Sequence, residues 1–303
     1  AGGTLISQIW LWFHLGKYVK FVKPDRDGIL ENIKPLIILF IPVIAVSLYK
    51  MMDKIMIGWV NKTELGYYEY AEKIIAIPMS VIEAIGVVML PRISKMLARG
   101  GKEASKHLIQ TSMKLNMVLA IAMAFGVSAI SREFAPVFFG NEYTACSLLM
   151  IGLSVTIPFL SFANVLRKQF MIPMKMDREY TIAVFCGAVV NLSCNLIFIP
   201  KLYARGAMIG TIFAEIVVCM MHIYSCRKDL PVKTYITTLI PYLVAGFCMY
   251  QAVRFTAKIV GMSIVGLVLE VLVGGVVYLF LVTVILVLQK DEIILKFNKH
   301  IKM

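Results

Sequence analysis

Residues 66–92 read GYYEYAEKIIAIPMSVIEAIGVVMLPR, and this stretch decides the class of the protein. It is apolar over a length that crosses the roughly 30 Å hydrocarbon core of a bilayer as a helix. Besides Arg92 at its very end, four charged side chains lie inside it: Glu69, Glu72, Lys73 and Glu83. A charge at the centre of a lipid-facing helix costs about 2.5–3.5 kcal/mol on insertion scales. The stretch therefore predicts a membrane helix whose charged side chains have partners or water.

The rest of the chain has the same character. Of its 303 residues, 59% are hydrophobic and 16% are charged, whereas soluble domains carry about 25% charged residues. Apolar runs of helical length recur, and the alternating pattern of a membrane barrel is absent from the sequence. We predict an all-α polytopic membrane protein with complete spans near 35–60, 65–90, 112–130, 143–166, 180–200, 205–225, 236–255 and 264–288.

These spans suggest a domain organisation. Residues 1–15 resemble the tail of a preceding transmembrane helix, and residues 16–34 form a cytoplasmic linker. Residues 35–226 form a bundle of six transmembrane helices, residues 235–288 add two more, and residues 289–303 are a basic cytoplasmic tail. Because the chain starts inside an apolar stretch, we expect a fragment whose upstream part is missing.

The net charge of +13 does not point to nucleic acid, because the cations lie between the spans. Segments rich in Lys and Arg alternate with segments that hold one or two such residues. The segment between the last two spans, for example, holds Arg254 and Lys258. By the positive-inside rule the rich segments are cytoplasmic, which places the C-terminus inside the cell. The rich segments are 16–34, 91–111, 167–178, 227–233 and 289–303.

Glu69, Glu72, Lys73 and Glu83 lie on one helical stripe, because the stripe through Ala76 and Ser80 follows steps of three and four residues. The preceding span carries a second cluster: Lys50, Asp53 and Lys54. Folding the hairpin about residue 62 brings this cluster to the depth of Glu69, Glu72 and Lys73. We predict an intramembrane charge network in the outer half of the bilayer, with Glu83 deeper. Such a network either locks two helices together or lines a hydrated cavity for a charged substrate or coupling ion.

A second polar region begins at Asn164. Arg167 and Lys168 share its helical face, and they act either as cytoplasmic anchors or as an inner entrance for anionic headgroups. Asn191 and Asn195, one turn apart in the next span, are typical of amides that join membrane helices by hydrogen bonds.

Three further features lie in the last spans. Glu215 stands mid-span and needs a partner from elsewhere in the fold. Gly206 and Gly210 form a GxxxG pattern, which predicts close helix packing. Glu270 lies nearer the outer end of its span, where it is expected only to snorkel. The six cysteines lack CxxC spacing and are predicted to pack, and no metal site, cofactor site or catalytic constellation is recognisable.

Two blocks resemble the bacterial polysaccharide (O-antigen and capsule) repeat-unit flippases. In the first, residues 66–94, Gly-x-Tyr and Ala-x-Lys precede a span that ends in Leu-Pro-Arg. In the second, residues 164–215 (NVLRKQFMIPMKMDREYTIAVFCGAVVNLSCNLIFIPKLYARGAMIGTIFAE), an Asn-rich span and Ile-Pro precede Gly-Ala and Thr-x-x-Ala-Glu. The resemblance covers residues 30–225 well and the ends loosely.

This family belongs to the multidrug/oligosaccharidyl-lipid/polysaccharide exporter superfamily. The resemblance implies two six-helix bundles around a cavity that opens to one side at a time, of which this chain holds the second bundle and two extra helices. The implied substrate is an undecaprenyl-pyrophosphate-linked oligosaccharide in the bacterial plasma membrane. The implied partners are membrane lipids, the missing N-terminal bundle and polysaccharide polymerase machinery.

The resemblance also suggests roles for the charged residues. Cavity cations would compensate the pyrophosphate: Lys50, Lys54 and Lys73, with Arg167 and Lys168 at the inner entrance. A charge network would hold these lysines between substrates or bind a coupling H⁺ or Na⁺: Asp53, Glu69, Glu72, Glu83 and Glu215.

Other functions remain open. A multidrug or organic-cation antiporter of the same superfamily should have a net acidic cavity, whereas the charges here are close to balance. A membrane enzyme of polysaccharide assembly usually has a sizeable extracytoplasmic loop, and every outer loop here is short. A truncated product with half a cavity could not alternate access by rocking against a partner half.

Overall fold

The computed structural model describes residues 9, 10, 12, 13, 15 and 25–289. It divides into two compact units, residues 1–41 and 42–303, and helix α2 (Arg26–Val60) runs from the first into the second. The first unit contains the start of this helix, at Arg26. The remaining elements belong to the second unit: α3 (Lys62–Ala98), α4 (Lys102–Phe139), η1 (Asn141–Tyr143), α5 (Thr144–Ser154), α6 (Thr156–Leu166), η2 (Arg167–Met171), α7 (Asp177–Leu202), α8 (Ala204–Cys226), α9 (Val232–Val260) and α10 (Ile264–Leu288).

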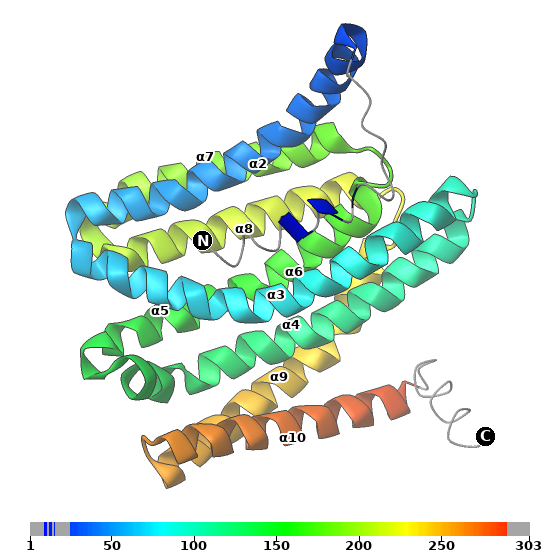
Figure 1. Ribbon diagram of the computed structural model, residues 1–303. Coiled ribbons are helices and arrows are strands. Elements are labelled where there is room, and N and C mark those ends of the chain that lie inside the picture. The colour runs from blue at the N-terminus through cyan, green and yellow to red at the C-terminus, as the bar shows by residue number, and fades with distance from the viewer. Residues whose placement is uncertain (1–8, 11, 14, 16–24, 290–303) are drawn as a thin grey trace. The chain divides into compact units, whose positions relative to one another are not determined.

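Helices of the second unit run up and down between two ends (Figure 1). The turns at Asn61, Gly140, Tyr203 and Gly261 lie at one end, which we call the Asn61 end. The turns between α3 and α4, α6 and α7, and α8 and α9 lie at the other, which we call the Gly100 end. The Gly100 end carries the Lys- and Arg-rich segments 91–111, 167–178 and 227–233, so the arrangement of this unit agrees with the alternation of charge in the sequence.

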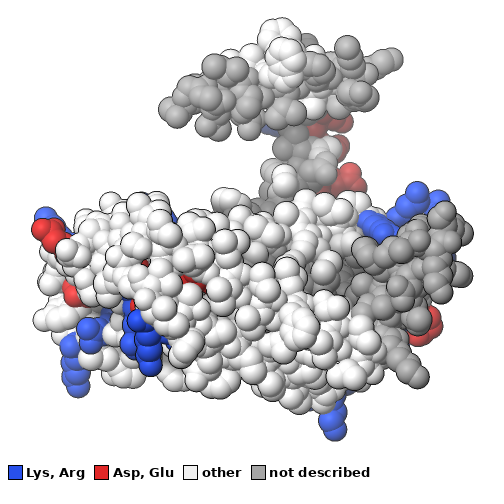
Figure 2. Space-filling model, turned by 90° about the horizontal axis from the view of Figure 1, so that it is seen from below, with Lys and Arg blue, Asp and Glu red and all other residues white. Residues whose placement is uncertain are grey.

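The all-helical prediction is confirmed, since the described residues contain helices and turns and no strand. Within the part of the chain that the structure describes, seven helical segments are long and apolar enough to cross a membrane, and they match the spans expected from residue 65 onward. The expected span 35–60 is helical within α2. On the face shown in Figure 2, much of the described surface is uncharged, and charged side chains gather mainly toward its two ends.

The span expected over 143–166 is present within Asn141–Met171, but it is bent at Val155 into two helices. Helix α5 stops at Ser154 and α6 starts at Thr156, where the hydroxyls of both residues donate to backbone carbonyls three residues earlier at 2.7 Å. Such back-bonding bends helices. After α6 the chain widens into a π turn, η2, in which the Ile172 amide donates to the Arg167 carbonyl at 2.9 Å. Turns of this kind are frequent at functional sites.

Close packing of α7 on α8 confirms the GxxxG prediction. A Cβ on Gly206 would lie 2.5 Å from the backbone of Phe198, and one on Gly210 would lie 2.4 Å from the side-chain oxygen of Asn195. At the opposite flank, α9 and α10 pack together against α4 (Figure 1). Two buried apolar clusters fill the space between the helices, one around Tyr242 and one around Tyr68.

Most of residues 1–15, residues 16–24 and nearly all of the 289–303 tail lie outside the described residues. The division into a six-helix bundle and an added pair therefore stays a prediction, as does the fragment status of the chain. Within the expected linker, α2 is already helical from Arg26.

Candidate substrate and ion sites

An ion pair joins α2 to α3. The Lys54 ammonium nitrogen lies 2.8 Å from a carboxylate oxygen of Glu72, with side-chain exposures of 36% and 34%. The hairpin turn that makes this possible is capped by Asn61, whose side-chain oxygen accepts from the amides of Thr63 and Glu64. The predicted pairing of the two clusters across the hairpin is thus confirmed for these two residues. The side chain of Lys50 lies outside the described residues.

The stripe on α3 occupies the open face of that helix. The apolar side of α3 is buried, including Tyr68, Ile75 and Ile82. Lys73 and Glu83 are exposed, and Glu69 and Glu72 are partly exposed. Lys73 lies over the ring of Tyr70, with 5.2 Å between its nitrogen and the ring centroid. An open charged face on a membrane-long helix requires water or further protein against it, because lipid would not solvate these groups.

Asp53 is placed differently from the prediction. Its carboxylate turns into the protein, where it is 3% exposed, instead of joining the open charged stripe. It accepts hydrogen bonds from the Thr211 hydroxyl at 3.1 Å, from the Tyr68 hydroxyl at 3.3 Å and from the Asn195 amide. Asn195 also donates to the Asn191 side chain at 3.0 Å. The prediction that these amides join helices is confirmed for Asn195, which reaches α2, while Asn191 is bonded to Asn195 on its own helix.

The Asp53 cluster consists of Asp53, Tyr68, Asn191, Asn195 and Thr211, and it draws on four helices. Asp53 and Asn195 each lie seven residues before the end of their helix, and Thr211 lies seven residues after the start of α8. Each is therefore about 10 Å along a helix from the Asn61 end. The Asn195 side-chain oxygen is buried without a hydrogen-bond partner among the described residues. The cluster thus surrounds one carboxylate inside the bundle with two hydroxyls and an amide nitrogen that donate to it.

Arg167 and Lys168 stand at the π turn near the Gly100 end. The Arg167 guanidinium lies over the ring of Tyr180, 4.8 Å from its centroid. The Lys168 ammonium reaches the Glu83 carbonyl at 3.5 Å, and its chain passes over Gly86, where a Cβ would come within 2.9 Å. Lys168 therefore borders the open face of α3 at its deeper part, whereas Arg167 points toward Tyr180 of α7.

Glu215 lies on α8 and is only 5% exposed. It is one turn from Cys219 and two turns from His222, which are also buried on that helix. The ring of Tyr180 lies 5.8 Å from that of His222, centroid to centroid, so this buried side of α8 faces the Arg167 region. The expectation that Glu215 draws on partners beyond its own span is consistent with this placement.

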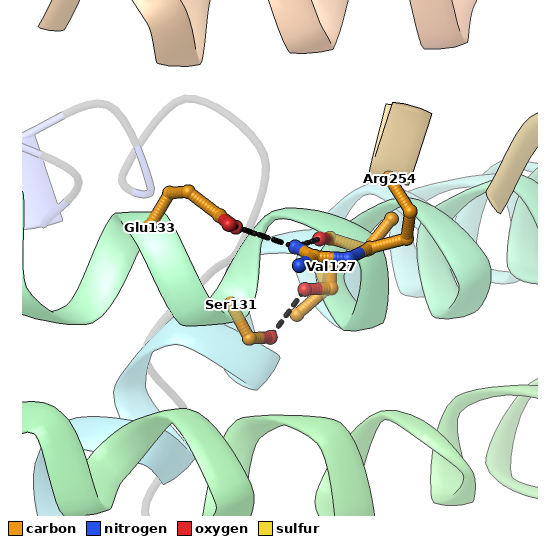
Figure 3. Close-up of polar contacts among 5 residues, drawn as sticks. Val127, Ser131, Glu133 and Arg254 are labelled. Carbon is orange, nitrogen blue, oxygen red and sulfur yellow. Dashed lines mark hydrogen bonds and ion pairs between the residues drawn. The ribbon is translucent and has the colours of Figure 1, made fainter. Parts of the chain in front are cut away.

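Sequence reasoning missed several polar residues. Tyr68 and Thr211 gave no signal because hydroxyl residues are common in membrane spans. Arg254 belongs by sequence to the outer-loop cations, but it lies within α9 and forms a buried ion pair with Glu133 of α4 (Figure 3). Glu270 does not snorkel, because it is fully buried against neighbouring helices. For both Glu133 and Glu270, the sequence offered one signal of a buried carboxylate, namely a single acidic residue near the end of an apolar span.

These features define a polytopic helical membrane protein that carries ionisable groups inside its spans, the design typical of transporters. Comparison with known proteins agrees with that class. The chain belongs to the family described as lipid II flippase MurJ, whose sequence model matches residues 4–285.

The individual relatives share less than a quarter of their aligned residues with this chain. The chain is 23% identical over 238 residues to the probable low-salt glycan biosynthesis flippase Agl15 of Haloferax volcanii, covering 76% of this chain and 49% of the relative. It is 22% identical over 227 residues to the lipid II flippase MurJ of Bacillus subtilis, covering 70% and 41%. It is 24% identical over 275 residues to a probable lipid II flippase MurJ of Rhizobium meliloti, covering 85% and 51%.

The fold is shared with a solved structure of the lipid II flippase MurJ in an inward closed conformation. The TM-score is 0.75 at 17% identity, over 94% of this chain and 61% of the other. The chain spans about half the length of the curated relatives it matches.

Proposed function

We propose that this chain forms the C-terminal part of a flippase that moves an undecaprenyl-pyrophosphate-linked oligosaccharide from the inner to the outer leaflet of a bacterial plasma membrane. The partners are membrane lipids, an N-terminal bundle of the same protein and polysaccharide polymerase machinery. The C-terminus is cytoplasmic, and transport proceeds by alternating access of the cavity between the bundles. The chain acts as a transporter and not as an enzyme.

The observation that carries this proposal is the open charged face of α3. Pyrophosphate and sugars cannot cross hydrocarbon unaided, because their desolvation is too costly. A hydrated face with Lys54 and Lys73 offers them cations, and Arg167 with Lys168 offers cations nearer the Gly100 end. Glu72 holds Lys54 when no substrate is present, and the pyrophosphate replaces that carboxylate during transport. Lys50 belongs to the same set by its position in the sequence.

The Asp53 cluster is the proposed site of the coupling ion, H⁺ or Na⁺. A buried carboxylate beside two hydroxyls suits a small hard cation, which prefers oxygen ligands. Asp53 and Thr211 would hold it, and the Asn195 side chain, which donates to Asp53, would turn to offer its oxygen. Thermal unfolding of the purified protein with NaCl or choline chloride tests the ion directly. Stabilisation by Na⁺ that disappears in Asp53→Asn supports a sodium site, and equal unfolding temperatures in both salts would reject it.

The substrate is proposed to be a repeat unit of a cell-surface polysaccharide, on the resemblance of residues 66–94 and 164–215 to repeat-unit flippases. Lipid II is the competing substrate, on the names of the Bacillus and Rhizobium relatives. An organic-cation antiporter is the competing class, but the open face of α3 offers lysines as well as carboxylates.

Deletion of the complete gene in the source cells separates these substrates. Lipid extracts analysed by mass spectrometry should show accumulated undecaprenyl-pyrophosphate-linked repeat unit, with loss of surface glycan. Accumulated lipid II in its place would reassign the substrate. Unchanged lipid-linked sugars with new sensitivity to cationic dyes would favour the antiporter. The full-length double variant Lys50→Ala, Lys73→Ala is then expected to fail to restore surface glycan, and full restoration would overturn the role of these lysines.

A further inference from the structure

A buried group of three charged side chains joins α9 and α10 to α4, away from the sites described above. The Arg254 guanidinium nitrogen Nη1 lies 2.7 and 2.9 Å from the two carboxylate oxygens of Glu133, and it also donates to the Ala129 carbonyl at 3.1 Å (Figure 3). Glu133 is 6% exposed. The positive charge of Arg254 therefore neutralises the negative charge of Glu133.

Glu270 of α10 is the third member. Its exposure is 0%, and neither of its carboxylate oxygens has a hydrogen-bond partner among the described residues. The charged groups that act on it are Glu133 on α4 and Arg254 on α9. The neighbouring charged side chains Arg132 and Lys258 are exposed.

The helix geometry fixes Glu270 at this level. The buried residues of α10 follow every fourth position: Gly266, Glu270, Gly274, Tyr278 and Val282. A Cβ on Gly274 would lie 2.8 Å from Val253, the neighbour of Arg254. Glu133, Arg254 and Glu270 each stand six residues from the end of their helix at the Asn61 end. All three are therefore about 9 Å along a helix from that end.

The charges in this group do not balance. One guanidinium faces two carboxylates, and the pairing with Glu133 uses it. An ionised carboxylate without partners in a membrane interior is very costly, so such a group binds a proton or a cation. Metal cations require several oxygen ligands, whereas Gly266 and Gly274, which flank Glu270 on its face, supply no side chain.

We infer that Glu270 is a proton-binding site, and that its proton decides which carboxylate Arg254 pairs with. With the proton on Glu270, Arg254 stays on Glu133 and ties α9 to α4. When the proton leaves, Glu270 becomes a second anion beside Arg254 and competes for it. This site is separate from the Asp53 cluster. Glu270 and Arg254 lie on α10 and α9, the two helices predicted to be additions to the bundle.

Dicyclohexylcarbodiimide tests the inference without a transport assay. A protonated carboxyl group in apolar surroundings adds across a C=N bond of this reagent, and an acyl shift leaves a stable acylurea. The protein is treated in membranes at pH 7, digested and analysed by mass spectrometry. We expect the adduct on Glu270 and not on Glu133. Glu270→Gln should remove the adduct from that peptide.

Two variants give the inference a stricter test. In Glu133→Gln, Arg254 is free to pair with Glu270, and because a guanidinium favours the ionised carboxylate, labelling of Glu270 should fall by about tenfold or more. In Arg254→Gln, Glu133 loses its partner and should become labelled, which also shows that the reagent reaches the group. Labelled Glu133 in that variant with unlabelled Glu270 in the parent protein would overturn the inference.

Infrared difference spectra provide a readout that does not depend on reagent access. The parent protein minus Glu270→Gln should show the carbonyl band of a protonated carboxyl group. Since Gln has nearly the shape of a protonated Glu, this variant should also fold normally. A carboxylate band in place of the carbonyl band would show that Glu270 is ionised and would refute the proton site.

Discussion

The Lys54 ammonium lies 2.8 Å from the Glu72 carboxylate, so the hairpin of α2 and α3 carries an ion pair at matching depth on both helices. Both side chains are about one-third exposed. A pair of this exposure stabilises a protein by only about 0–1 kcal/mol. The pair therefore adds little to stability, and we propose that it holds Lys54 ready for an anionic substrate.

Lys54→Ala should separate stability from transport. We expect the unfolding temperature to change little, because the pair is partly exposed. Restoration of surface glycan should fall on the order of tenfold, since the substrate pyrophosphate loses a cation worth about 1.4 kcal/mol. The matched control is Lys106→Ala, which breaks the exposed Lys106–Glu103 pair of 2.9 Å and should preserve function. Equal loss of function in both variants would contradict the substrate role of Lys54.

Gly206→Ala should weaken the packing of α7 on α8. The added methyl group would lie 2.5 Å from the Phe198 carbonyl, and backbone cannot yield as a flexible side chain does. Overpacking of this kind costs about 1–3 kcal/mol. Gly275→Ala on α10 is the control, because a Cβ at that position would meet no atom within 4 Å. A lower unfolding temperature for Gly206→Ala alone is the expected result, and equal temperatures would argue against tight packing.

The helices were predictable because membrane spans are long and apolar. The direction of each span was predictable because segments rich in Lys and Arg alternate with segments poor in them. The match of Lys54 with Glu72 followed from counting outward from the turn, since both helices rise equally per residue. The environment of Asp53 did not follow, because Asn195 and Thr211 lie more than 140 positions away in the chain. Sequence spacing reports which residues share a helix face, and it carries no record of which helix packs on that face.

The placement of Glu270 also could not be predicted from its position in the span alone. Its position near a helix end suggested an interfacial side chain, yet α10 packs this face against α9 and α4. The spacing of Gly266, Glu270 and Gly274, four residues apart, was visible in the sequence, and the structure shows that this face of α10 is buried. Small residues at that spacing indicate a helix–helix contact, and a carboxylate among them is then inside the contact.

Thr211→Val should remove one hydrogen bond from Asp53 while preserving the shape of the side chain. Thr211 donates to the Asp53 carboxylate at 3.1 Å and lies 3.0 Å from the Tyr68 hydroxyl. Hydrogen bonds between membrane helices contribute on average about 0.6 kcal/mol, so the unfolding temperature should fall modestly. Thr211→Ser retains the hydroxyl and should restore the sodium dependence of unfolding. If Ser and Val behave alike, the hydroxyl has no part in the cluster.

The cytoplasmic position of the C-terminus is tested by reporter fusions. Green fluorescent protein fused after Met303 of the full-length protein should fluoresce, because it folds in the cytoplasm, and alkaline phosphatase fused there should stay inactive. Fusions after Val260, at the Asn61 end, should show the opposite activities, because the positive-inside rule places that turn outside. Active phosphatase at the C-terminus would invert the proposed topology.

Lys168→Gln should impair transport more than Arg178→Gln. Lys168 passes over Gly86 toward the Glu83 carbonyl, so its charge lies at the deeper part of the open α3 face. Arg178 is exposed at the start of α7 and serves as the matched control for loss of one cation. An inner entrance for pyrophosphate predicts weaker restoration of surface glycan by Lys168→Gln, with lipid-linked oligosaccharide accumulating in those cells. Lys168→Arg, which retains the charge, should restore much of the function. If both Gln variants restore glycan equally, Lys168 is an ordinary cytoplasmic anchor, and the positive charge at the π turn orients the protein without contacting its substrate.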